Sequence, residues 1–210
     1  MERQLVASAL EHVGLAAADD TIDRLLELSG ELAFWGPKLG LSTLEDENVV
    51  LVRHVLDSLL LAKVAPAPPT LLDIGTGAGL PAVPLAMAWP QCHVVAMDGK
   101  RKSNWLVTKL ASQFALENLE HVCRRADSAE ARGSLAGQFD MVTSRGLAQV
   151  EKALALSRPY LTPEGVISVL GGPDLDERPG HPNEELRIIE IPGTEWRRRI
   201  LLRRGSVTDL

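Results

Sequence analysis

A run of small and apolar residues, LLDIGTGAGLPAVP at Leu71–Pro84, constrains the fold of this chain more than any other stretch. Its apolar start, which ends at Ile74, is typical of a short buried strand. Glycines follow at alternate positions from Gly75 to Gly79, and the residues from Leu80 on predict the start of a helix. Glycine turns sharply and lets a ligand lie against bare backbone. The stretch therefore predicts a strand, a tight loop and a helix N-terminus that together hold a ligand.

The spacing of the glycines and the acidic residue before them indicate the kind of ligand. A dinucleotide-binding loop reads G-x-G-x-x-G and holds a diphosphate, whereas here the pattern is G-x-G-x-G with Asp73 two residues ahead of it. A carboxylate there repels a diphosphate, which disfavours a nicotinamide dehydrogenase, and it suits a cationic ligand such as S-adenosylmethionine. Asp98, after the apolar run Val94–Met97, is placed to accept hydrogen bonds from ribose hydroxyls. The alternatives are a purely structural turn around Asp73 and a helix N-cap at Asp98.

The chain from residue 66 on alternates predicted strands with predicted helices. Such alternation is typical of a doubly wound, mostly parallel sheet. Two further strands near the end, 186–191 and 199–202, predict a closing antiparallel hairpin. The other predicted strands cover 70–74, 93–97, 120–123, 139–144 and 165–170, and the predicted helices cover about 80–89, 101–116, 127–132 and 148–156.

Residues 1–65 are predicted to be helical. A first helix ends near Gly14, a second begins near Asp19 and ends at Gly36-Pro37, and a third covers about 45–63. On this third helix Arg53 and Asp57 have the i,i+4 spacing of an ion pair. The proline-rich stretch 65–69 reads as a stiff, extended linker. We therefore expect a small N-terminal helical subdomain, 1–65, and a ligand-binding domain, 66–210.

The overall composition is that of a soluble protein. The 210 residues carry a net charge of −6, which counts mildly against a dedicated nucleic-acid binder because such proteins are usually basic. No apolar run is long enough for a transmembrane helix, and the charged start lacks a signal-peptide core, so we expect a cytoplasmic protein. Cys92 and Cys123 are predicted at opposite ends of neighbouring strands and are expected to be free thiols. No residue cluster has metal-ligand spacing, so no metal is expected.

Three motifs together resemble one family. They are IGTGAGLPAVPLA in the glycine loop, RHVLDSLL at Arg53–Leu60 and FDMVTSRGLA at Phe139–Ala148. They are similar to motifs of the bacterial small-subunit (16S) ribosomal RNA guanine-N7 methyltransferases (RsmG, also called glucose-inhibited division protein B). The resemblance implies a Rossmann-like class I methyltransferase fold in the α/β class, with a mostly parallel seven-stranded sheet. It also implies S-adenosylmethionine as cofactor and the small ribosomal subunit as partner of a monomer that binds no membrane.

Arg145 is the predicted catalytic residue. It follows the predicted strand 139–144 at the edge where open α/β sheets bind ligands, and its guanidinium could hold a phosphate or the cofactor's carboxylate. An ion pair with a neighbouring carboxylate is the alternative. The predicted cofactor contacts are Asp73, Gly75, Thr76, Gly77, Gly79, Leu80, Asp98, Ala126, Asp127 and Arg145, and the predicted substrate contacts are Arg53, His54, Lys100, Arg101 and Lys102.

Some positions depart from the family pattern. The family's W-N-x-x-x-N-L-T has glycines here, Gly36 and Gly40, in place of both asparagines, and Gly171 replaces the lysine after the fifth strand. A methyltransferase of the same fold that acts on a small molecule, a protein or another RNA is therefore an alternative, and a cofactor-binding module without turnover is a third hypothesis. Trp35 and Trp105 are candidates for stacking on RNA bases, although core packing is the commoner fate of tryptophan.

Overall fold

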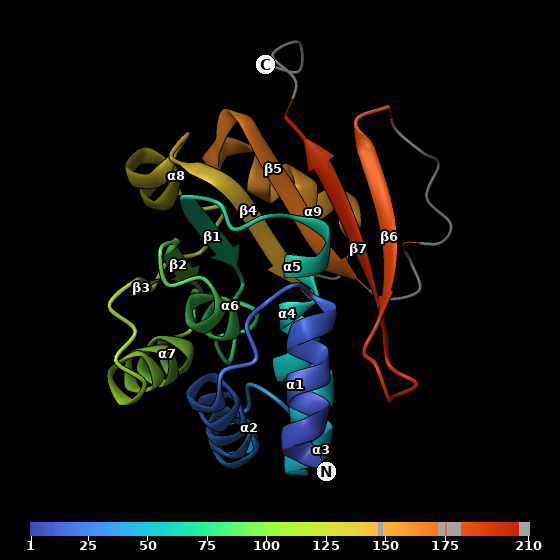
Figure 1. The fold of residues 1–210 in the computed structure, drawn as a ribbon. Coiled ribbons are helices and arrows are strands. Elements are labelled where there is room, and N and C mark those ends of the chain that lie inside the picture. Colours follow the sequence, from blue (N-terminus) through green and yellow to red (C-terminus); the bar gives the residue numbers. More distant parts are fainter. Residues whose placement is uncertain (147–148, 172–174, 176–181, 206–210) are drawn as a thin grey trace.

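The structure is a computed structural model that describes residues 1–146, 149–171, 175 and 182–205. Within these residues the strands form one seven-stranded sheet in the order β3-β2-β1-β4-β5-β7-β6, as Figure 1 shows. The strands from β1 to β5 pair in parallel, whereas β7 runs antiparallel to both β5 and β6. The predicted parallel sheet with a closing hairpin is thus confirmed. The strands are β1 (Thr70–Ile74), β2 (His93–Met97), β3 (Leu119–Val122), β4 (Phe139–Arg145), β5 (Leu161–Gly171), β6 (Glu184–Glu190) and β7 (Arg197–Arg204).

Helices cover both faces of the sheet. Alternate strand residues point to opposite faces, so Leu71 packs with one set of helices while its neighbour Leu72 packs on the other side. The first face is covered by the N-terminal helices with α6 (Ala82–Ala88) and α7 (Arg101–Gln113). The second face carries α8 (Ala129–Leu135), α9 (Val150–Ser157) and the 3₁₀ turn η2 (Arg158–Tyr160). This arrangement is the doubly wound architecture predicted from the alternating elements.

The first two helices are α1 (Glu2–His12) and α2 (Asp19–Leu39). The prediction that α2 ends at Gly36-Pro37 is wrong, because the helix continues for one more turn with Pro37 inside it. Proline removes a single backbone donor, and the turn is completed by Gly40, whose left-handed conformation (φ 64°) ends the helix. The carbonyl of Gly36 accepts hydrogen bonds from Leu41 and Ser42, which folds the chain back at this point.

The third predicted helix is interrupted. It consists of α3 (Glu47–Val50), a π-helical turn η1 (Leu51–Leu56), α4 (Asp57–Leu59) and α5 (Leu61–Val64). A π-helical turn changes which side chains share a helix face, and such turns are frequent at functional sites. Asp57 follows this turn directly.

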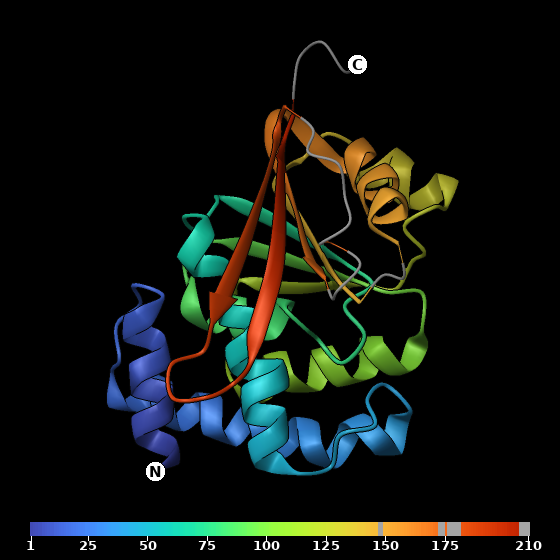
Figure 2. The same cartoon turned by 90° about the vertical axis from the view of Figure 1, so that its right-hand side faces the viewer.

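Residues 1–65 share one continuous core with the sheet. The cluster that contains Leu10 and Leu28 of α1 and α2 also contains Leu71, Met141 and Ile200 of the strands. In Figure 2 the β6–β7 hairpin extends from the sheet toward these helices. The boundary predicted between residues 65 and 66 stays a prediction.

Two smaller expectations can be compared with the structure. Cys92 is buried, Cys123 is exposed and both are free, as predicted. None of the helices in the described part of the chain has the length and apolar character needed to span a membrane.

Candidate functional site

The loop between β1 and α6 forms the tight turn predicted from its glycines. Gly75, Gly77 and Gly79 have φ angles of 74°, 56° and 89°, in the left-handed region that strains other residues. A Cβ on Gly79 would lie 2.6 Å from Cγ2 of Val83, so this glycine permits close packing of the loop on α6. A Cβ on Gly77 would meet no protein atom nearer than 3.9 Å. The space beside Gly77 is therefore open to a ligand.

Asp73 lies beneath this loop with its side chain fully buried. Its Oδ2 accepts a hydrogen bond from the backbone N–H of Ala82 at 3.2 Å, whereas its Oδ1 is buried without a hydrogen-bond partner. Burial raises the pKa of Asp73 to about 7. A buried carboxyl with an unused acceptor is costly unless a ligand or a proton satisfies it.

Asp98 joins the glycine loop to the start of α7. Its Oδ2 accepts from the N–H of Gly77 at 3.0 Å and its Oδ1 accepts from the N–H of Lys100 at 2.8 Å. The N-cap position of α7 is Lys100, which makes no side-chain cap. The structure therefore favours a role for Asp98 in the loop over the helix N-cap that the sequence left open.

A cavity of about 740 Å³ opens over the glycine loop. Its floor is the loop itself, Gly75–Ala78 with Leu80, and one side is the segment Leu41–Leu44 that follows α2. The other side is a polar wall of charged and aromatic side chains from η1, β4 and the β6–β7 hairpin. The wall residues that line the cavity are Arg53, His54, Arg145, Trp196 and Arg198.

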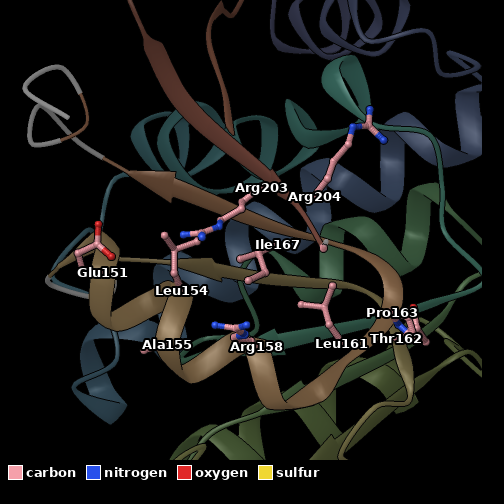
Figure 3. A pocket seen from close by; sticks show the side chains of 11 residues that line it. Glu151, Leu154, Ala155, Arg158, Leu161, Thr162, Pro163, Ile167, Arg203 and Arg204 are labelled. Carbon is pink, nitrogen blue, oxygen red and sulfur yellow. The ribbon is translucent and has the colours of Figure 1, made fainter. Parts of the chain in front are cut away.

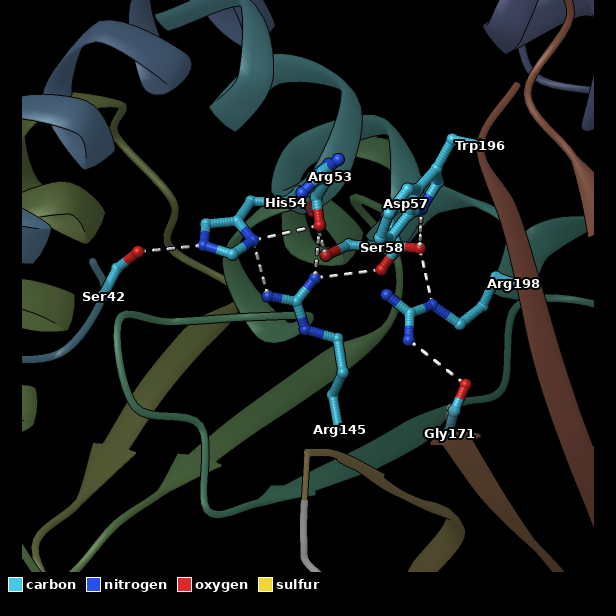
Figure 4. A network of polar contacts seen from close by, with 9 residues as sticks. All are labelled: Ser42, Arg53, His54, Asp57, Ser58, Arg145, Gly171, Trp196 and Arg198. Carbon is cyan, nitrogen blue, oxygen red and sulfur yellow. Dashed lines mark hydrogen bonds and ion pairs between the residues drawn. The ribbon is translucent and has the colours of Figure 1, made fainter. Parts of the chain in front are cut away.

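The centre of the polar wall is Asp57, which is fully buried (Figure 4). Its Oδ2 accepts from Nη1 of Arg145 at 2.9 Å. Its Oδ1 accepts from Nε of Arg198 at 2.6 Å and from Nε1 of Trp196 at 2.8 Å. One carboxylate thus holds two arginines, from β4 and β7, against the N-terminal helices.

The predicted i,i+4 ion pair between Arg53 and Asp57 is wrong. The guanidinium of Arg53 lies 4.8 Å from the ring centroid of Trp196, while Asp57 contacts Arg145 and Arg198. Asp57 is buried where β4 and β7 bring two arginines within reach, whereas Arg53 lines the cavity beside Trp196. The alternative considered for Arg145, an ion pair with a neighbouring carboxylate, is the arrangement in the structure.

His54 is held as a neutral imidazole. Its Nδ1 lies 3.0 Å from Nη2 of Arg145 and 2.9 Å from the carbonyl oxygen of Arg53. Its Nε2 faces Oγ of Ser42 at 3.1 Å. Burial, followed by the charge of Arg145, lowers the pKa of His54. The carbonyl of Arg53, in the same π-helical turn, accepts from Nη1 of Arg145 at 3.2 Å.

A glycine brings the Leu41–Leu44 segment into this contact. A Cβ on Gly36 would lie 3.0 Å from Cβ of Ser42, so a larger residue would press against it. The hydroxyl of Ser42 also accepts from the N–H of Leu44 at 3.1 Å. Gly36, one of the positions that depart from the family pattern, therefore lets Ser42 pack against α2.

The structure brings together only part of the predicted site. Asp127 pairs with Arg125 at 2.9 Å and 3.0 Å on the surface, and the carbonyl of Ala126 accepts from the hydroxyl of Tyr160 at 2.6 Å, away from the cavity lining. Their role as cofactor contacts stays a prediction. The exposed Lys100, Arg101 and Lys102 lie outside the lining too. The predicted residues that do line the cavity are Gly75, Thr76, Gly77, Leu80, Arg53, His54 and Arg145.

The sequence did not predict three residues of the polar wall as site residues. They are Asp57, at its centre, and the Asp57 partners Trp196 and Arg198. Asp57 was visible within RHVLDSLL, but its partners lie 139 and 141 residues away. The sequence feature that could have pointed to them is a tryptophan followed by three arginines in the closing hairpin.

A second cavity, of about 210 Å³, lies at the opposite edge of the sheet between α9, β5 and β7. Its walls include Leu154, Leu161 and Ile167 (Figure 3). It contains none of the predicted site residues.

Comparisons with known sequences place the chain in a family. The family model described as rRNA small subunit methyltransferase G matches residues 21–186. A "Ribosomal RNA small subunit methyltransferase G" of Acinetobacter baumannii (strain SDF) is 30% identical over 196 residues, which cover 91% of this chain and 92% of the relative. One of Syntrophotalea carbinolica is 32% identical over 165 residues, 79% of this chain and 76% of the relative. The chain belongs to this family. The predicted family is confirmed, and with it a methyltransferase that uses S-adenosylmethionine.

Solved structures support the fold of this family member. A methyltransferase from Aquifex aeolicus, titled as SAM dependent, has a TM-score of 0.55 at 15% identity and covers 79% of this chain and 96% of that one. A precorrin-6y C5,15-methyltransferase from Geobacter metallireducens has a TM-score of 0.52 at 18% identity and covers 71% of this chain and 87% of that one. At such identities the likeness concerns the fold alone. The predicted class I methyltransferase fold is confirmed.

Proposed function

We propose that the protein transfers a methyl group from S-adenosylmethionine to N7 of a guanine in the RNA of the small ribosomal subunit. The observation that carries this proposal is the glycine loop over buried Asp73, which opens into a cavity whose far wall holds two arginines. Membership of a family described as rRNA small subunit methyltransferase G supports the choice of RNA.

The residues present fit S-adenosylmethionine. The open space beside Gly77 admits a ligand against the backbone. Asp73, buried beneath the loop and outside the cavity lining, favours a cationic ligand through its negative charge when ionised. Each carboxylate oxygen of Asp98 accepts one backbone hydrogen bond and keeps further lone pairs for hydroxyl groups of a ribose. When bound, the cofactor supplies a methyl group on a positively charged sulfur.

The polar wall suits an acceptor that needs no general base. Guanine N7 has a free lone pair, so the protein must position the base and exclude water instead of removing a proton. The described contacts of Arg145 use three of its five N–H groups. The remaining ones can donate to a phosphate or to a guanine O6. Neutral His54, held by Arg145 and Ser42, serves to orient the arginine.

The finer predictions follow from this proposal. We propose that the substrate is the small subunit as a particle, whose shape reduces the need for a strongly basic enzyme, and that the protein acts as a monomer in the cytoplasm. The net charge of −6 agrees with recognition by local patches instead of overall charge.

The test is methyl transfer from radiolabelled S-adenosylmethionine to small ribosomal subunits that lack N7-methylguanosine. Free ribosomal RNA and intact ribosomes serve as comparison substrates, and Gly77→Val serves as a variant without a cofactor site. Label at a guanine N7 of the subunit, absent with the variant, supports the proposal. Cofactor binding by calorimetry without label in any ribosomal substrate overturns it in favour of another acceptor.

A further inference from the structure

Three aromatic rings lie edge to face on the surface formed by α2 and α7. The ring of Trp35 is in contact with Phe34 and with Trp105, and both pairs have ring centroids 4.9 Å apart. Phe34 is 52% exposed and Trp105 is 46% exposed. Contiguous exposed apolar patches, unlike single exposed residues, mark binding surfaces. We call Phe34, Trp35 and Trp105 the aromatic platform.

Basic groups surround the aromatic platform. Nζ of Lys38 lies 3.1 Å from the ring centroid of Phe34, and Nζ of Lys109 lies 5.8 Å from that of Trp35. Arg101 is exposed and precedes Trp105 by four residues in α7, which places both on one helix face. Lys102 is also exposed in the first turn of α7.

Glu31 lies beside the platform, and Lys109 neutralises its charge. Glu31 accepts from Nζ of Lys109 at 2.6 Å and from Nε1 of Trp35 at 3.0 Å, and together these contacts lower its pKa although burial opposes them. Glu27 lies beside Glu31 and accepts from the same Nε2 of Gln113. The basic side chains of this surface outnumber these two acids, on a chain whose net charge is −6; they are Lys38, Arg101, Lys102 and Lys109.

Both helices of the platform connect directly to the cavity of the candidate site. α2 ends at Leu39, and the segment that follows, Leu41–Leu44, lines the cavity. α7 begins three residues after Asp98, which holds the glycine loop.

We propose that the aromatic platform is a docking surface for single-stranded RNA next to the methylated guanine. An unpaired base stacks on the exposed ring of Trp105, and Lys38, Arg101 and Lys102 contact phosphates. Exposed aromatic rings combined with basic groups are the features of proteins that bind single-stranded nucleic acid, whereas a protein interface is generally depleted in lysine. The inference rests on the proposed function for its choice of RNA as the ligand.

The first experiment measures binding without chemistry. A single-stranded oligoribonucleotide is titrated into the full chain while tryptophan fluorescence is recorded. We expect the RNA to quench the fluorescence. Trp105→Ala should weaken the apparent affinity for the RNA at least fivefold, and Trp105→Phe, which keeps a ring for stacking, should weaken it less. Ile188→Ala on β6, where the side chain is also 52% exposed, is the matched control and should bind normally. Lys38→Ala should reduce the salt dependence of binding.

The second experiment measures methyl transfer to small ribosomal subunits. Trp105→Ala should raise KM for the subunit at least fivefold while calorimetry finds unchanged affinity for S-adenosylmethionine. An unchanged KM with active enzyme overturns the platform and leaves the proposed function intact. If quenching depends on Trp105 but the protein methylates no ribosomal RNA, the platform is supported as an RNA-binding surface and the proposed function is overturned. Dimerisation in sedimentation that is lost in Trp105→Ala, without RNA binding, assigns the surface to a second copy of the chain and overturns the inference.

Discussion

Arg145 and Asp57, 88 positions apart in the chain, form an ion pair with 2.9 Å between Nη1 and Oδ2. The carboxylate is fully buried and the arginine side chain is 13% exposed. The pair joins the end of β4 to the N-terminal helices, and Arg198 joins β7 to the same carboxylate. One buried group thus fixes three parts of the cavity wall relative to one another.

The first prediction concerns the stability contributed by Asp57. Asp57→Asn removes the charge that two arginines share, and breaking a buried ion pair from one side costs about 3–5 kcal/mol. We expect the free energy of unfolding, measured by urea denaturation, to fall by about that amount. Glu190→Gln is the matched control, because Glu190 pairs with Arg197 at 3.0 Å on an exposed edge and such pairs contribute about 1 kcal/mol or less. Equal losses in the two variants would contradict the central role of Asp57.

Arg145→Ala separates support of the wall from action on the substrate. We expect the variant to fold, because Asp57 keeps Arg198 and Trp196 as partners, and to lose at least about tenfold in methyl transfer through loss of positioning. Circular dichroism and the radiolabel assay measure the two effects. Arg197→Ala, which removes an exposed arginine of the same hairpin, should retain full activity. A fully active Arg145→Ala protein would mean that this arginine only supports the fold.

Gly77→Val tests the glycine loop. The φ of 56° and the open space beside Gly77 both disfavour a β-branched residue there. We expect calorimetry to detect no binding of S-adenosylmethionine to the variant. Gly14→Val provides the control for backbone strain, since Gly14 has a φ of 79° with nothing within 4 Å of a Cβ and lies outside the cavity lining. Normal binding by Gly77→Val would remove the loop from the cofactor site.

His54 should titrate below its ordinary pKa. Burial and the charge of Arg145 lower the pKa of His54 from 6.5, so the unfolded chain binds a proton that the folded protein refuses as the pH falls. The stability linked to this group is therefore present above pH 6.5 and is lost progressively below it. Nitrogen NMR over a pH series should show His54 gaining its second proton only below pH 6.5. The signal is assigned through its absence in His54→Gln, and a midpoint at or above pH 6.5 would contradict the prediction.

Asp73 should give the opposite pH dependence in the protein without ligand. Burial raises the pKa of Asp73 to about 7, against 3.8 in an exposed chain. The folded protein therefore retains a proton that the unfolded chain has lost between these values, and stability falls as the pH rises from about 4 to 7. Asp73→Asn lacks this dependence, so denaturation at several pH values should show the variant gaining on the wild type across that range. A constant difference would mean that Asp73 is already ionised at pH 4.

The sequence by itself determined the sheet, its strands near the glycine loop and the loop conformation. These features come from local signals, since β1 and β2 are mostly apolar and only glycine adopts the φ angles of Gly75, Gly77 and Gly79 without strain. The glycine spacing and Asp73 pointed to the cofactor, which the family motifs supported, and the predicted strand 139–144 placed Arg145 at the end of β4.

The tertiary structure decided the partners of the charged side chains. Periodicity paired Arg53 with Asp57 on one helix, but the packing of β4 and the closing hairpin against this helix gave buried Asp57 to Arg145 and Arg198. The end of α2 also depended on the tertiary structure. Pro37 predicted an earlier end, but the packing of Ser42 and the cap at Gly40 place the end one turn later. Helix register, burial and long-range ion pairs depend on the whole fold, because a buried charge takes its partner from whatever element the packing brings within reach.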